Sequence, residues 1–179
     1  MMPETQNKFV TTLAICHFVV ALLLVILLLG LHNRPEFGVG MSKTYVRADR
    51  AVEKAIAESV PGSFVLLPIH AIVQLILPLL LLTTGVALFF GKGWGRTLTL
   101  VYAVVSLLDA LWYGGSLYAV TWSNGEALQA AMAAEHLGSE RIAEVVRVQT
   151  PAIVVGVLYP IFVLLGLAKI GRPRIADLP

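Results

Sequence analysis

Four long apolar runs constrain this chain more than any other feature, and they cover residues 9–31, 64–90, 97–121 and 150–169. A helix rises ~1.5 Å per residue, so about 20 apolar residues can cross a hydrocarbon layer ~30 Å thick. The chain is 58% hydrophobic and only 13% charged. A soluble domain of this length needs more polar side chains to cover its surface. The pattern therefore predicts an all-α integral membrane protein whose four spans form a transmembrane helix bundle.

We expect one membrane domain over residues 1–179, because the segments between the runs are too short to hold a separate soluble module. The first run exceeds the about 7–15 apolar residues of a signal peptide. The segment that follows it, Leu31-His32-Asn33, offers no small-x-small cleavage site. The first run is therefore interpreted as a retained span.

Basic residues near the ends of the spans set the expected orientation. Lys8, the short loop 91–96 and the C-terminal tail carry basic residues with few acidic neighbours. The two long loops, 32–63 and 122–149, contain a similar number of basic residues but dilute them with acidic ones. The density of basic charge predicts a multi-pass protein of the plasma (inner) membrane, with both termini cytoplasmic and both long loops exterior.

Both long loops show the periodicity of amphipathic helices. Residues 44–60 place apolar side chains at three- and four-residue spacing, with charged side chains mainly on other faces. The second loop does the same after a turn at Asn124-Gly125, and Ser139 can cap a further helix that includes Val145 and Gln149. Such helices can pack together as a small exterior cap, lie in the headgroup layer or bind a partner. Mutual packing is the simplest of these arrangements.

The hydropathy pattern also repeats, since each half of the chain contains a span, a long loop and a second span. The second span of each half carries a proline, at Pro78 and Pro160. Repeats of this kind occur in transporters, where broken helices flank a binding site. The alternative is that any bundle with an even number of spans looks two-fold.

Few side chains within the runs can take part in proton transfer or ligand binding. They are His17, His70, Gln74, Asp109 and Tyr159. Helical rise places Asp109 about 18 Å from the cytoplasmic end of its span. The same count places His70, Gln74 and Tyr159 about 9, 15 and 14 Å from the exterior ends of theirs. These four residues can therefore share one layer near the midplane. Asp109 is the only acidic residue in any run, and an ionised carboxyl is strongly disfavoured there without a partner.

Two interpretations of this layer remain open. In the first, His70, Gln74, Asp109 and Tyr159 form a ligand-binding or proton-accepting pocket. In the second, they form a buried hydrogen-bond network that fixes helix packing, or the carboxyl faces a partner subunit. Nearby prolines can kink the helices and make room for a ligand or water, although prolines are common in membrane helices.

No cofactor or metal is predicted. Haem between His17 and His70 needs both ligands at one depth, but the helical rise separates them by about 9 Å along the membrane normal. Ligation within one chain is therefore disfavoured, while a histidine from another subunit could still pair with His70. No second carboxylate accompanies Asp109, and Cys16 is the single cysteine, so no metal site is expected.

The sequence contains no catalytic motif and no long basic block, so neither an enzyme nor a nucleic-acid partner is expected. The leading hypothesis is a non-enzymatic accessory or assembly subunit of a larger membrane complex. Its partners would be membrane lipid and other membrane subunits or a second copy of this chain. The alternative is a small proton-coupled transporter or membrane ligand-binding protein that uses the polar layer. A redox subunit that carries quinone or haem comes third.

Overall fold

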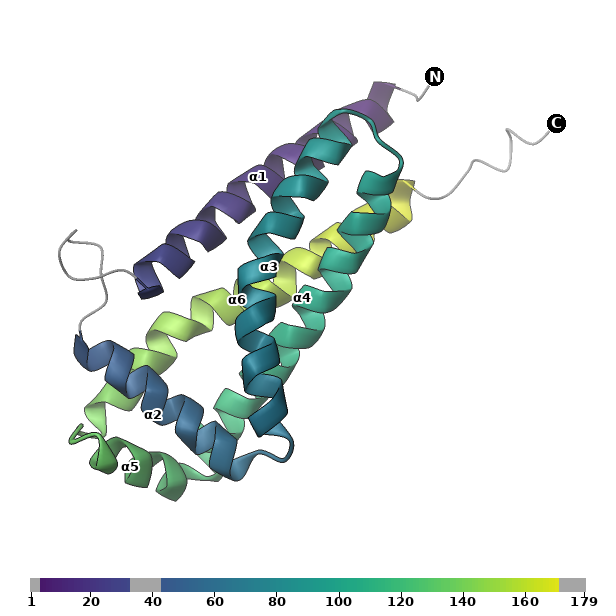
Figure 1. Cartoon of the computed structure of the whole chain (residues 1–179). Coiled ribbons are helices and arrows are strands. Elements are labelled where there is room, and N and C mark those ends of the chain that lie inside the picture. The colour runs from purple at the N-terminus through teal and green to yellow at the C-terminus, as the bar shows by residue number, and fades with distance from the viewer. Residues whose placement is uncertain (1–3, 33–42, 171–179) are drawn as a thin grey trace.

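The computed structural model describes residues 4–32 and 43–170, and every regular element in these two ranges is helical (Figure 1). Residues 33–42, in the first predicted loop, lie outside the described part. The elements, in chain order, are α1 (Glu4–His32), α2 (Lys43–Ser59), α3 (Ser63–Phe89), α4 (Trp94–Tyr118), the π-helical turn η2 (Ala119–Ser123), α5 (Gly125–Ala134) and α6 (Glu140–Ile170).

Four of these helices are long and apolar enough to cross a membrane, as the sequence predicts. Their mean hydropathy ranges from 1.4 for the stretch that includes α4 to 2.7 for the stretch in α1. The qualifying stretches are Lys8–Ile26, Ser63–Phe89, Trp94–Ser123 and Glu140–Ala168.

The fourth long helix differs from the sequence prediction. The sequence predicts an amphipathic loop helix followed by a separate span at 150–169, whereas α6 is one helix from Glu140 to Ile170. It continues through Pro151, although proline removes one backbone hydrogen bond and crowds the preceding turn. Val145 before the proline and Ile153 after it pack on the same apolar cluster, and this burial on both sides favours a continuous helix.

The four long helices pack as a chain of neighbours, with α1 on α3, α3 on α4 and α4 on α6. Small residues allow close approach at these contacts. A Cβ atom added to Gly85 of α3 would lie 3.3 Å from the Ala14 carbonyl oxygen of α1. A Cβ added to Gly156 of α6 would lie 2.9 Å from the Cβ of Ala110 in α4.

The shorter helices α2 and α5 pack against each other and, with the first turns of α6, form a unit that we call the cap. Its apolar core includes Val52 and Ile56 of α2, Leu128 and Met132 of α5, and Val145 of α6. The cap lies at one end of the long helices, while the start of α1, the α3–α4 turn and the end of α6 lie at the other (Figure 1). The mutual packing expected of the loop helices is therefore present.

Candidate functional site

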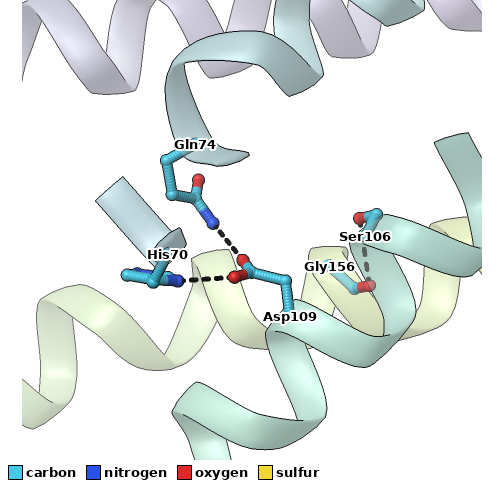
Figure 2. Close-up of polar contacts among 5 residues, drawn as sticks. All are labelled: His70, Gln74, Ser106, Asp109 and Gly156. Atoms are coloured by element: carbon cyan, nitrogen blue, oxygen red, sulfur yellow. Dashed lines mark hydrogen bonds and ion pairs between the residues drawn. The ribbon is translucent and has the colours of Figure 1, made fainter. Parts of the chain in front are cut away.

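Asp109 on α4 is held by two polar side chains of α3 (Figure 2). Gln74 donates from Nε2 to Oδ2 of Asp109 over 2.8 Å, and the Nδ1 atom of His70 lies 2.8 Å from Oδ1. The side chains of His70 and Asp109 are only 16% and 8% exposed. Oδ2 accepts the amide hydrogen, so the hydrogen of the second bond lies between Oδ1 and Nδ1, on the imidazole or on the carboxyl according to the tautomer of His70.

Local helix geometry explains why α3 supplies both partners. His70 and Gln74 are four residues apart, so they lie on the same face one turn apart. The short connection between α3 and α4 makes these two helices antiparallel neighbours, and this brings Asp109 beside that face. The structure thus brings together three of the four residues that the sequence places in one layer.

His70 also stacks on an aromatic ring, that of Tyr113 on α4. The two rings stack with centroids 4.2 Å apart and planes 2° from parallel. Trp112 lies further off, with its ring centroid 6.1 Å from that of His70. The stacked ring and the Asp109 bond together fix the orientation of the imidazole.

Tyr113 also connects the site to the cap, because it is part of the apolar cluster beneath α2 and α5. Beside it lies Gln149 of α6, whose Nε2 donates to Oδ1 of Asp49 on α2. Burial raises the pKa of Asp49 to about 6, and the charge of Glu53 acts in the same direction. His70 is near enough to Asp49 to oppose this rise. The carboxyl of Asp49, which belongs to the cap, is therefore a second carboxyl near His70.

One face of α4 is polar along most of its length, and we call this face the α4 stripe. Its members recur every three or four residues, which places them on one side of a helix, and they are buried within the structure. The stripe comprises Thr99, Tyr102, Ser106, Asp109, Tyr113 and Ser116. Tyr102, Tyr113 and Asp49 are not among the candidate residues that the sequence predicts. The three- and four-residue spacing of polar residues within the run 97–121 is a signal that could have identified Tyr102 and Tyr113.

Tyr159 does not join the Asp109 group. Its hydroxyl is hydrogen-bonded to Nδ1 of His17 on α1, in a second polar cluster. Its other aromatic neighbour is Tyr102 of α4. The expected four-residue layer is therefore two groups, because depth along a helix does not say which neighbouring helix a side chain faces.

The described side chains contain no group of three or more His, Cys, Asp and Glu residues placed to hold a metal ion. Comparison of this chain with protein families, with curated proteins and with solved structures gave no match. Function is therefore inferred from the chemistry of the residues themselves.

Proposed function

We propose that this chain is a small proton-coupled transporter or ligand-binding membrane protein whose proton-accepting site is Asp109 with His70 and Gln74. The observation that supports it is the pair of contacts to the two carboxyl oxygens, in which Nδ1 of His70 can exchange a hydrogen with Oδ1. A carboxyl within a membrane span is costly and usually functional. The side chains of His70 and Asp109 are 16% and 8% exposed, so this chain alone does not enclose the pair completely.

The proposed function includes a membrane topology for the chain. The helices α1, α3, α4 and α6 cross the plasma (inner) membrane as a four-helix bundle, with the cap on the exterior side and both termini in the cytoplasm. The four apolar stretches have the length for this, and the cap lies at the end opposite the α3–α4 turn. Asp109 then lies inside the hydrocarbon layer, and the carboxyl of Asp49 marks the exterior approach to it.

The test is an infrared titration of the purified protein in lipid. A protonated carboxyl in an apolar site has its own C=O stretching band, and Asp109 is the only acidic residue within the apolar runs. We expect this band to change with pH and to vanish in Asp109→Asn, while Thr83→Ala, an exposed site on α3, leaves it intact. If the band of Asp109 does not change over the whole pH range in which the protein is folded, the carboxyl keeps one protonation state. Asp109 would then only stabilise helix packing, and the proposal would be wrong.

An accessory subunit of a larger membrane complex remains the second candidate, and one observation favours it. In α3 and α6 only 17% of the most apolar stretch is buried within this chain. The exposed faces carry large apolar side chains such as Phe64, Leu79 and Leu165, which suit a second subunit as well as lipid. Purification in mild detergent distinguishes the two candidates, because an accessory subunit copurifies with partner proteins in fixed ratio.

A further inference from the structure

A second polar cluster lies deeper in the long helices and has no part in the site at Asp109. It joins His17 of α1, Tyr102 of α4 and Tyr159 of α6, whose ring centroids lie 5.8 to 6.2 Å from one another. We call it the His17 cluster. His17 is fully buried, and apolar side chains such as Leu13 surround the cluster.

The imidazole of His17 has one nitrogen in use and one without a partner. Nδ1 is hydrogen-bonded to the Tyr159 hydroxyl, whereas the buried Nε2 has no hydrogen-bond partner among the described residues. Buried polar atoms in native proteins are almost always hydrogen-bonded, so an exception needs an explanation such as a bound water or a role in proton transfer. When Nδ1 donates its hydrogen to the phenol oxygen, Nε2 carries a lone pair that can accept a proton.

The groups that face His17 are uncharged. Tyr102 comes from α4, Tyr159 from α6 and Cys16 from the same helix, while α3 contributes Gly85, which has no side chain. The Asp109 carboxyl is the acidic group that the α4 stripe connects to this cluster.

The α4 stripe supplies that connection. The Tyr102 hydroxyl lies near the Ser106 hydroxyl. Ser106 lies one turn from Asp109, and its Oγ donates to the carbonyl oxygen of Gly156 over 3.5 Å (Figure 2). Hydroxyl groups both donate and accept, so they can pass a proton along a row. The row leads from the Asp109 site, next to the cap, to the His17 cluster, further from it.

We infer that His17 is a second proton-accepting group, which exchanges a proton with Asp109 along Ser106 and Tyr102, with water between hydroxyls that are too far apart. This inference rests on the proposed function, because the proton first occupies the His70–Asp109 pair. One proton leaves the His70–Asp109 pair, and a proton binds Nε2 of His17. Asp109 is left as a carboxylate that accepts from Gln74 and, with the remaining imidazole hydrogen on Nδ1, from His70. His17 becomes a cation that still donates from Nδ1 to Tyr159. The total charge does not change.

The first experiment is ¹⁵N NMR of histidine-labelled protein in lipid bilayers, with the signals of His17 assigned by their loss in His17→Gln. We expect both ring nitrogens of His17 to become protonated as the pH falls within the range in which the protein is folded. A His17 that stays neutral throughout this range overturns the inference. The Asp109 infrared band is titrated on the same sample, so a failure at His17 with a titrating Asp109 leaves the proposed function intact.

The second experiment measures proton influx into protein-containing vesicles that hold a pH-sensitive dye. Tyr102→Phe keeps the buried ring and removes one hydroxyl of the row. We expect it to slow influx at least about tenfold, while Asp109 still titrates. Tyr118→Phe is the matched control, since this tyrosine of the same helix is 60% exposed. Influx in Tyr102→Phe equal to the wild-type rate, or a wild-type rate no higher than that of empty vesicles, overturns the inference.

Discussion

The imidazole of His70 lies flat on the ring of Tyr113, with centroids 4.2 Å apart and planes 2° from parallel. Tyr113 belongs to the apolar core of the cap, and His70 is the partner of Asp109. One stacked pair therefore joins the cap to the site within the long helices. A change in the position of the cap is expected to move the imidazole and so alter the proton that it shares with Asp109.

Tyr113→Ala is expected to affect both units. Loss of a buried aromatic ring lowers the free energy of unfolding by about 3–5 kcal/mol. The imidazole also loses its stacked neighbour, so the carboxyl band of Asp109 should shift. Tyr113→Phe keeps the ring and should change stability by less than about 1.5 kcal/mol. Denaturant unfolding and the infrared band of the two variants check this, and equal effects of Ala and Phe would contradict the stacking argument.

Asp109→Leu should destabilise the protein by about 1–3 kcal/mol, because it leaves the buried donors of His70 and Gln74 without an acceptor. Asp109→Asn retains an acceptor oxygen for Gln74, so its effect on stability should be smaller even though the site can no longer take up a proton. Leu108→Ala, at a neighbouring position that is 63% exposed, serves as the control. The free energy of unfolding in detergent is the measurement, and a Leu variant as stable as the wild type would refute the prediction.

Asp49 should make stability depend on pH. Its pKa is about 6 in the folded protein and 3.8 in the reference state, so the folded state binds more protons between these values. The stabilisation is complete below pH 4 and is lost as the pH rises through 6, with a total of about 3 kcal/mol. Asp49→Asn, which can still accept from Gln149, should remove this slope. Glu58→Gln, at an exposed position of the same helix, should keep it, and unfolding measured from pH 4 to pH 7 decides.

Two glycines of the long helices provide a matched pair for testing the contact between α4 and α6. Gly156→Ala would bring the new Cβ to 2.9 Å from the Cβ of Ala110, so the helices must move apart. We expect a loss of about 1–3 kcal/mol in the free energy of unfolding. Gly115→Ala meets no atom within 4 Å and should be neutral or slightly stabilising. Similar losses in both variants would show that α4 and α6 do not pack in this way.

Part of the site follows from the sequence, because some relationships within it are local. His70 and Gln74 are four residues apart, so any helix that contains them places them on one face. Asp109 can also be recognised from the sequence, since it is the only acidic residue in an apolar run. Depth along a helix can be counted from its ends, but depth does not say which neighbour a side chain faces. Tyr159 therefore contacts His17 and not the Asp109 group.

The sequence by itself determined that the chain has four long apolar helices and amphipathic helices between them, because hydropathy and periodicity belong to each segment alone. Only the tertiary structure decided that the α4 stripe faces inward, that Asp109 contacts His70, and that Tyr159 contacts His17. A helix that is apolar on nearly all sides carries little signal about which face turns toward its neighbours. The rotation of each helix about its own axis is set by packing between helices far apart in the chain, at close contacts such as the one between Gly156 and Ala110.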